Sequence, residues 1–210
     1  NLAMPPAPKS LLQLAGAPLA PGPLNRSVLV LIDAQLEYVN GRLPLDRVDA
    51  AIAEAAFLLA VARKVAMPVF HIMHHAPAGA ALFAEDSPTI EIVPQLAPGA
   101  GEIVLRKRLP NAFAGTDLHA LIQSSGRSEI IFAGFMTHMC VSASARAALD
   151  LDYRSTVVAG ACATRDLPDP LGGVIPASVV HRTALSELAD RFAVVVKDTA
   201  ALIPAAQRPA

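Results

Sequence analysis

Short apolar runs recur along the chain and are separated by loops or amphipathic segments. The first, residues 27–33 (SVLVLID), is apolar at nearly every position. Such a run is typical of a strand buried on both faces of a parallel sheet. Comparable runs follow at residues 68–74, 102–106, 128–134, 155–159 and 193–196. The pattern therefore predicts six strands.

Segments with helical character lie between these runs. Residues 45–65 repeat apolar positions at helical spacing, and residues 137–149 are small and alanine-rich, which favours a helix packed closely on a sheet. Further helices are predicted at 116–124, with Thr116 as N-cap, and at 178–190. Strands that alternate with helices predict the α/β class, here a Rossmann-like three-layer α/β/α sandwich around a central, mostly parallel six-stranded sheet.

The chain is predicted to form one domain preceded by an arm. Residues 1–26 are rich in proline, which blocks helix interiors, so we expect an extended N-terminal arm with at most a turn at residues 10–14. Residues 166–173 have the composition of a linker but do not separate two cores. Residues 27–210 are therefore assigned to a single domain.

Composition and charge exclude several classes of protein. Hydrophobic residues make up 53% of the 210 positions, which excludes a disordered chain. Lys plus Arg (17) nearly balance Asp plus Glu (18), so no nucleic-acid partner is expected, and no apolar run is long enough to cross a membrane. Prolines interrupt any signal peptide, and the two cysteines suit a reducing compartment. We expect a cytoplasmic protein with a small-molecule substrate.

Three reactive side chains fall where strands are predicted to end. Asp33 ends the first run, Lys107 follows the third, and Cys140 lies just past the fourth. Ligands of open parallel sheets bind outside the carboxyl ends of the strands, so the three groups are expected to meet at one edge. Taken singly, each has a plainer interpretation as a core cysteine, a turn aspartate or a solvated lysine. Cys162 has no charged neighbour and is assigned to the core.

Together, these groups suggest nucleophilic catalysis. Cys140 is predicted in the first turn of a helix, where free N–H groups and a nearby Lys107 ammonium favour a thiolate. Asp33 would orient Lys107 and pass a proton to the leaving group. The same N–H groups can hold the oxyanion of a tetrahedral intermediate.

Three segments resemble the isochorismatase-like cysteine hydrolases, a family that includes nicotinamidases and N-carbamoylsarcosine amidohydrolases. The first is residues 28–38 (VLVLIDAQLEY), and the second is residues 107–113 (KRLPNAF). The third is residues 134–153 (GFMTHMCVSASARAALDLDY), and residues 179–192 are similar to the last helix of the family. The third segment departs from the family pattern at Asp152, where glycine is usual.

The resemblance implies a catalytic triad of Asp33, Lys107 and Cys140. It also implies an oxyanion hole from the backbone N–H groups of Met136 and Cys140, and a cis peptide bond between Phe135 and Met136. Substrate contacts are expected from residues in the loops at the same edge: Gln35, Tyr38, His75, Phe113, Phe135 and Thr137. Leu43, Phe83 and Met136 are further candidates for the lining of the pocket.

No cofactor and no metal are expected. Metal-binding members of the family carry a carboxylate beside their histidines, and His71, His74 and His75 have none. His74 and His75 are consecutive and would face opposite sides of a strand, so they could not both bind one ion. These histidines are interpreted as strand-end or pocket-lining residues.

Three functions remain open from the sequence. The first is a hydrolase of a small amide or ureido substrate that forms a thioester on Cys140. The resemblance favours it, because family members that act on isochorismate often lack this cysteine, and the mostly apolar pocket residues suggest an apolar or aromatic substrate. The second is hydrolysis of an isochorismate-like vinyl ether with Asp33 as general acid. The third is a catalytically silent assembly module. The apolar arm and alanine-rich helices also predict a homodimer or homotetramer.

Overall fold

Six parallel strands form the central sheet of the computed structural model, which describes residues 6–204. The strand order is β3-β2-β1-β4-β5-β8, and every pairing is parallel. The predicted sheet is therefore confirmed, with all six strands running the same way. The strands are β1 (Ser27–Ile32), β2 (Val69–His74), β3 (Ile103–Lys107), β4 (Glu129–Phe135), β5 (Arg154–Ala163) and β8 (Val194–Val196).

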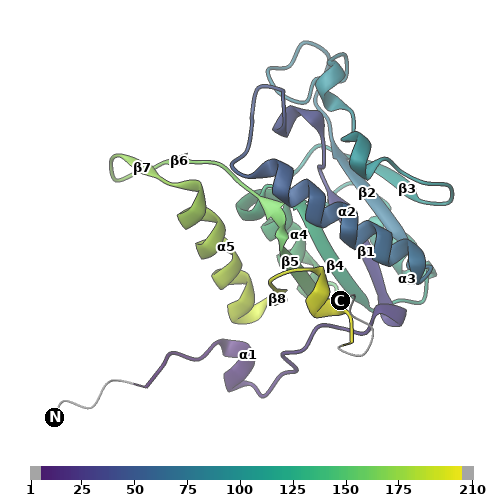
Figure 1. Ribbon diagram of the computed structural model, residues 1–210, viewed down its shortest axis with the longest axis vertical. Coiled ribbons are helices and arrows are strands. Elements are labelled where there is room, and N and C mark those ends of the chain that lie inside the picture. Colours follow the sequence, from purple (N-terminus) through teal and green to yellow (C-terminus); the bar gives the residue numbers. More distant parts are fainter. Residues whose placement is uncertain (1–5, 205–210) are drawn as a thin grey trace.

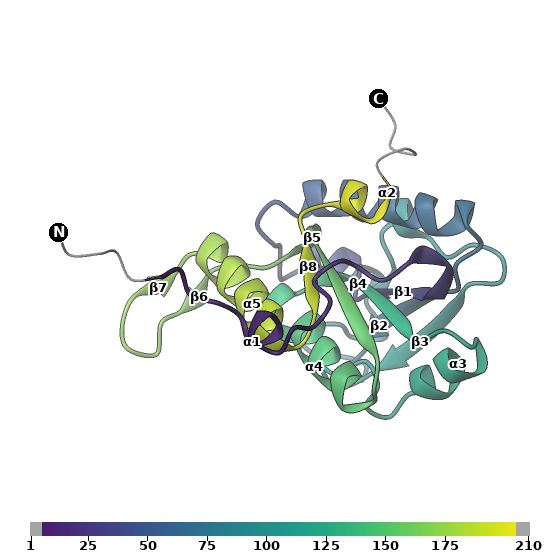
Figure 2. The same cartoon turned by 90° about the horizontal axis from the view of Figure 1, so that it is seen from below.

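Helices cover both faces of the sheet, as the three-layer prediction requires. Figure 2 shows α2 (Val48–Lys64) on one side of the sheet, and α3 (Leu118–Ser124), α4 (Ser142–Asp150) and α5 (Ala177–Arg191) on the other. The inner strands are buried on both sides, which explains why their sequences are apolar throughout rather than alternating. Short 3-10 turns occupy Leu24–Arg26, Leu36–Tyr38, Pro88–Ile90, Pro94–Leu96 and Thr199–Leu202.

The sheet separates two apolar cores. One contains the buried stripe of α2 together with Leu29 and Leu31 from β1. The other contains Val28 and Val30 from the same strand, packed with residues of α3 and α4, and it includes Cys140. Because side chains alternate across a strand, β1 supplies both cores and anchors the residue that follows it.

The described part of the N-terminal arm, residues 6–26, contains little regular structure. A single helical turn, α1 (Leu11–Leu14), is capped by Ser10 and rests against α5, and the Leu11 backbone N–H donates to Asp190. Residues 1–5 of the arm lie outside the described part. Figure 1 shows that residues 6–26 run along the lower edge of the molecule.

One segment forms an element that the sequence pattern did not indicate, and one local prediction is wrong. Residues 166–173 have the composition of a linker, but they belong largely to a small antiparallel hairpin of β6 (Leu167–Pro168) and β7 (Val174–Ile175). Strands of two residues are too short to give a period in sequence. Thr116 is not the N-cap of α3, which is Asp117, although the Thr116 hydroxyl accepts from the Leu118 N–H at 3.3 Å.

Gly134 lets β4 approach β1 closely at the edge where Asp33 lies. Its φ is +119°, and a Cβ there would overlap with the carbonyl oxygen of Ile32, the residue before Asp33. We therefore expect Gly134→Ala to destabilise the protein by more than about 3 kcal/mol, seen as a large loss of soluble, cooperatively folded protein.

Gly126→Ala is the matched control, because Gly126 has a φ of +70° but a Cβ added to it would have no atom within 4 Å. Gly126→Ala should lower the free energy of unfolding in urea by only about 1 kcal/mol, because the added methyl group causes backbone strain but no steric overlap. Equal stability of the two variants would contradict the close-approach explanation.

Candidate active site

Asp33, Lys107 and Cys140 meet at the carboxyl edge of the sheet, as predicted. Asp33 follows β1 with a φ of +51°, a left-handed conformation that Asp tolerates better than most residues. Cys140 follows β4, and the order of the strands reverses between β1 and β4. This reversal is the topological switch point at which α/β sheets bind ligands.

The Lys107 ammonium joins the other two groups. Its Nζ donates to Asp33 Oδ2 at 2.8 Å and to Cys140 Sγ at 3.3 Å. The side chains of Lys107 and Asp33 are fully buried. A lysine so deeply buried is rare unless it is paired, so the solvated interpretation of Lys107 does not hold.

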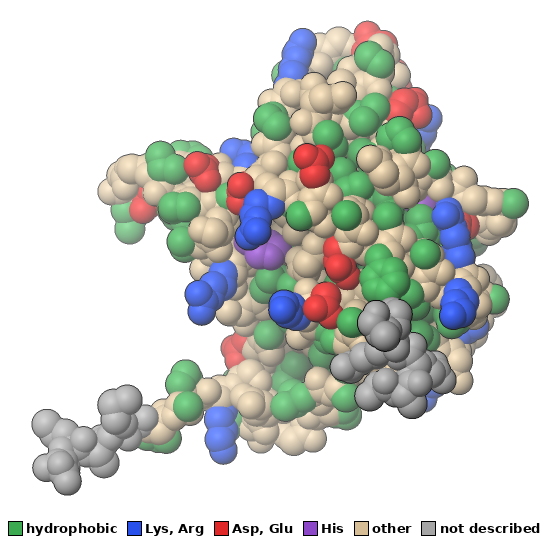
Figure 3. Space-filling view, viewed as in Figure 1, with side chains coloured by type: hydrophobic (Ala, Val, Ile, Leu, Met, Phe, Trp, Pro, Cys, Tyr) green, Lys and Arg blue, Asp and Glu red, His purple; other side chains and the backbone are tan. Residues whose placement is uncertain are grey.

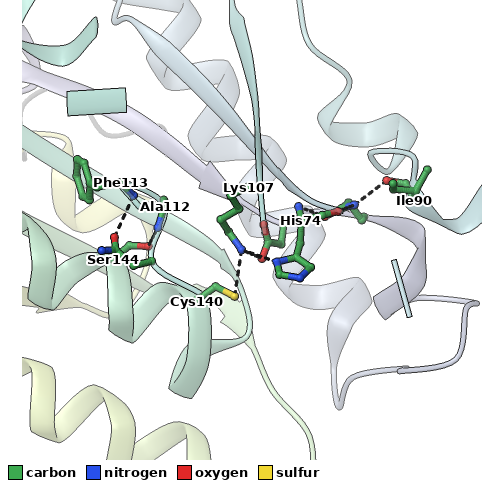
Figure 4. A network of polar contacts seen from close by, with 10 residues as sticks. His74, Ile90, Lys107, Ala112, Phe113, Cys140 and Ser144 are labelled. Atoms are coloured by element: carbon green, nitrogen blue, oxygen red, sulfur yellow. Dashed lines mark hydrogen bonds and ion pairs between the residues drawn. The ribbon is translucent and has the colours of Figure 1, made fainter. Parts of the chain in front are cut away.

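His74 is a third partner of Lys107 that the sequence interpretation missed. Its Nδ1 lies 3.0 Å from Lys107 Nζ (Figure 4). Burial, followed by the charges of Lys107 and His75, lowers the pKa of His74 to about 4, so the ring is neutral at pH 7. The sequence feature that could have identified His74 is its position at the end of β2, because this strand lies between β1 and β3 in the sheet.

The environment of Cys140 differs from the expected one. Burial and the negative charge of Asp33 raise the pKa of the thiol to about 12, and Lys107 opposes them only in part. The resting group is therefore a thiol, not the thiolate expected from its place in the sequence. Because Cys140 is only 4% exposed, loss of solvation outweighs the ammonium beside it.

Asp33 can take the thiol proton. Burial raises the pKa of its carboxyl above the ordinary value, against the opposing effect of Lys107. Oδ2 is bonded to Lys107, whereas Oδ1 is buried and has no hydrogen-bond partner among residues 6–204. A buried carboxylate with a raised pKa and an open oxygen suits a proton acceptor.

Two histidines brace the turn that carries Cys140. This turn, Thr137–Val141, is a π-helical segment that leads into α4. Thr137 Oγ1 lies 2.8 Å from Nδ1 of His181 on α5, and His138 Nδ1 lies 2.7 Å from the hydroxyl of Thr164 after β5. The peptide bond between Phe135 and Met136 is cis, as the family resemblance implied.

Aromatic side chains pack beside the triad. Tyr38 contacts the rings of Phe83 and Phe135 edge-on, at centroid distances of 5.1 and 5.7 Å. Burial raises the pKa of Tyr38, so its hydroxyl stays protonated. His75 has a buried Nδ1 without a partner in the described residues, which leaves it able to bind a substrate group.

Two residues expected to contact substrate make contacts within the protein. The amide of Gln35 is fully buried and is bonded to both backbone groups of His74 and to the carbonyl of Ile90. The ring of Phe113 stacks on Tyr153 at 6.2 Å, and Figure 4 shows it on the far side of Ser144 from Lys107. A substrate contact is not supported for Gln35.

The other histidine of β2, His71, makes its contacts away from Lys107. His71 Nε2 lies 2.7 Å from Glu102, which also binds Arg63 of α2 at 2.7 Å. Arg63 and the Gly99 N–H lower the pKa of Glu102 to about 2, although burial opposes them. Within residues 6–204, no group of three His, Cys, Asp or Glu side chains is placed to hold a metal ion.

One buried histidine and three half-buried histidines make stability depend on pH. Burial lowers the pKa of all four, so the unfolded chain binds more protons below about pH 6.5 and the folded state loses stability as pH falls. The lowered pKa of His74 alone reduces the free energy of unfolding near pH 5 by on the order of 1–2 kcal/mol. Asp33, with its raised pKa, acts in the opposite direction. The four are His71, His74, His138 and His181.

We therefore expect the melting temperature to fall by about 3–6 °C or more between pH 7 and pH 5 in calorimetry. Substituting His74→Asn should flatten this slope, because it removes one of the groups that takes up a proton on unfolding. A melting temperature that stays constant or rises over this range would contradict the assignment of these histidines as neutral in the folded protein.

Comparison with known proteins agrees with the geometry. The family model described as Isochorismatase domain matches residues 27–200. A crystal structure of an isochorismatase from Pseudomonas putida is 42% identical, with a TM-score of 0.89 over 94% of this chain and 100% of that one.

Two curated relatives extend the comparison. The secreted isochorismatase effector Isc1 of Verticillium dahliae is 36% identical over 89% of this chain and 96% of that protein. The maleamate amidohydrolase of Pseudomonas putida is 32% identical over 64% of this chain and 70% of that protein. With the fold, the converging strand ends and the matched domain in agreement, this chain belongs to the isochorismatase family of hydrolases.

Proposed function

We propose that this protein hydrolyses the C–N bond of a small amide or ureido substrate through a thioester on Cys140. The observation that carries the proposal is the buried contact of one ammonium, Lys107, with both the carboxylate of Asp33 and the sulfur of Cys140. A thiol beside a base and an orienting cation is the arrangement that nucleophilic acyl transfer requires. The name of the maleamate amidohydrolase relative is consistent with this chemistry.

The first half-reaction forms the thioester. Asp33 accepts the Cys140 thiol proton as the sulfur attacks the carbonyl carbon, and Lys107 stays positive beside the developing negative charge. The backbone N–H groups of Met136 and Cys140 would hold the oxyanion of the tetrahedral intermediate. The C–N bond then breaks, and protonated Asp33 returns its proton to the leaving nitrogen.

The second half-reaction regenerates the enzyme. Asp33 takes a proton from a water molecule as the oxygen attacks the thioester carbonyl. The C–S bond breaks, the acid product leaves, and the Cys140 sulfur recovers the proton from Asp33. This cycle starts and ends with a thiol, which agrees with the raised pKa of Cys140.

Hydrolysis of a vinyl ether is the second candidate, and the Isc1 relative named as an isochorismatase favours it. In that reaction Asp33 would protonate the substrate, and the sulfur of Cys140 would have no role. The presence of a cysteine whose sulfur accepts a hydrogen bond from Lys107 favours the amide reaction.

A substrate screen tests the proposal. Purified protein is incubated with small amides, ureido compounds and isochorismate. Released ammonia or amine is measured for the amides and ureido compounds, and released pyruvate is measured for isochorismate. We expect release from at least one amide or ureido compound. Turnover of isochorismate alone would favour the vinyl ether reaction, and folded protein without any turnover would favour a silent family member.

We also propose the cofactor requirement, the cellular location and the oligomeric state of the protein. We expect no cofactor, a small-molecule substrate, a cytoplasmic location and a homodimer or homotetramer. Charges of both signs are interspersed on the face in Figure 3, and no described helix is long and apolar enough to span a membrane.

Oligomerisation is supported by the hairpin of β6 and β7, which projects from the body in Figures 1 and 2. It carries Leu171 (95% exposed) and Val174 (65% exposed), and exposed apolar surface of this kind is typical of an interface. A light-scattering mass of one chain would contradict this expectation.

A further inference from the structure

The Lys107 ammonium has three hydrogens to donate and three acceptors around it. Two of them, Asp33 and Cys140, belong to the triad. The third is Nδ1 of His74 at 3.0 Å, which no step of the proposed reaction uses. Figure 4 shows Lys107 between Cys140 on one side and His74 on the other.

The direction of the third hydrogen bond follows from charge. An ammonium can only donate, so His74 Nδ1 must accept with its lone pair, and the ring hydrogen is on Nε2. The depressed pKa of His74 agrees with this neutral form. His74 therefore adds an acceptor to the site without adding a charge that would compete with Asp33 or with the developing thiolate.

The protein holds His74 in place from several directions. Its backbone N–H donates to Gln35 Oε1 at 2.9 Å, and its carbonyl accepts from Gln35 Nε2 at 2.8 Å. Its ring meets Phe83 edge-on at 5.1 Å. His74 also pairs with Lys107 in the register of β2 and β3, which sets the two side chains next to each other.

We propose that His74 is a positioning residue of the hydrolase, whose neutral ring accepts one Lys107 hydrogen and thereby keeps another directed at the sulfur of Cys140, with Gln35 holding His74 in register. This inference rests on the proposed function.

The physical reason is rotation of the ammonium. With two acceptors, the head group of a flexible lysine stem can turn, and its third hydrogen is a buried donor without a partner. With three acceptors, each of the three ammonium hydrogens is directed at one acceptor. The N–H that faces the sulfur then stays there while negative charge develops on it, which is the geometry that electrostatic stabilisation requires.

The test compares His74→Asn with His74→Leu. The two side chains have nearly the same shape, but only Asn offers an oxygen near the position of Nδ1. We expect His74→Leu to lower kcat by about 10- to 100-fold with KM changed by less than about 3-fold, since small displacements of catalytic groups cost this much. His74→Asn should stay within about 5-fold of the wild type. If His74→Leu folds poorly, His74→Phe takes its place, because it also lacks an acceptor, and the same loss of kcat is expected for it.

A readout without substrate separates this inference from the proposed function. The rate at which iodoacetamide alkylates Cys140 at pH 8, followed by peptide mass spectrometry, should fall about 10-fold in His74→Leu and stay near the wild-type rate in His74→Asn. This comparison holds even if the substrate screen finds no amide. His119→Gln is the control, because it removes a histidine hydrogen bond to Tyr153 outside the site and should change neither rate.

Two results would overturn the inference. One is a His74→Leu protein with wild-type kcat and wild-type alkylation. The other is a folded His74→Asn protein that loses as much as His74→Leu, because the acceptor would then be irrelevant.

Discussion

Replacing Cys140 with Ala is expected to abolish hydrolysis, with kcat lowered by at least about 10⁴-fold, while the protein remains folded. The reason is that the sulfur forms the covalent intermediate, and no nearby side chain can replace it. The thiol is small and buried in the second core, so its removal should cost only about 1 kcal/mol of stability. Steady-state kinetics and thermal melting of the same sample measure both quantities.

Cys162→Ala is the matched control. Cys162 is also buried, and burial also raises the pKa of its thiol to about 12, but no charged side chain within residues 6–204 forms a hydrogen bond with it. Its loss should leave kcat within about 3-fold of the wild type. Surviving turnover in Cys140→Ala would favour the vinyl ether reaction with Asp33 as the acid.

Replacing Lys107 with Met is expected to have the largest effect on stability. Met has a similar length and no charge, so Asp33 would be left as a fully buried carboxylate without its cation. Breaking one partner of a buried pair typically costs about 3–5 kcal/mol, and activity should be lost with it. Urea unfolding of the variant measures the change in free energy.

The double variant Asp33→Asn with Lys107→Met separates charge from packing. Asn tolerates the left-handed backbone at position 33, and no charge then remains unpaired. We expect it to recover most of the lost stability but none of the activity. If Lys107→Met alone were as stable as the wild type, the two charges would not be coupled as the 2.8 Å contact implies.

The sheet and the meeting of Asp33, Lys107 and Cys140 at one edge could be predicted because both depend on simple regularities. Apolar runs without alternation indicate strands covered on both faces, and alternation with helices indicates a parallel sheet. The carboxyl ends of parallel strands meet at one edge, so Asp33, Lys107 and Cys140 could be brought together without knowledge of any distance. Family resemblance in the same three segments strengthened the assignment.

The role of His74 was missed because it depends on register. Sequence periodicity gives the face on which a residue lies, and it served only to separate His74 from His75. The pairing of His74 with Lys107 arises from the alignment of β2 with β3, which tertiary packing sets. The hydrogen bonds of Gln35 could not be foreseen for a similar reason, since they go to backbone groups of residues 74 and 90.

The protonation state of Cys140 also depends on tertiary structure. From the sequence, a helix start and a lysine both favour a thiolate. In the folded protein, burial and Asp33 outweigh them and keep the thiol protonated. The lysine does lie beside the sulfur, but burial, which can only be judged in the fold, decides the sign.

Direct detection of the intermediate tests the central claim. Protein is mixed with a turned-over amide, quenched in acid within the first turnovers, digested, and analysed by peptide mass spectrometry. The account predicts the mass of the acyl group on the peptide that contains Cys140, lost on treatment with hydroxylamine, and none on the peptide that contains Cys162. An acyl group on any other residue, or rapid turnover without any adduct on Cys140, would contradict it.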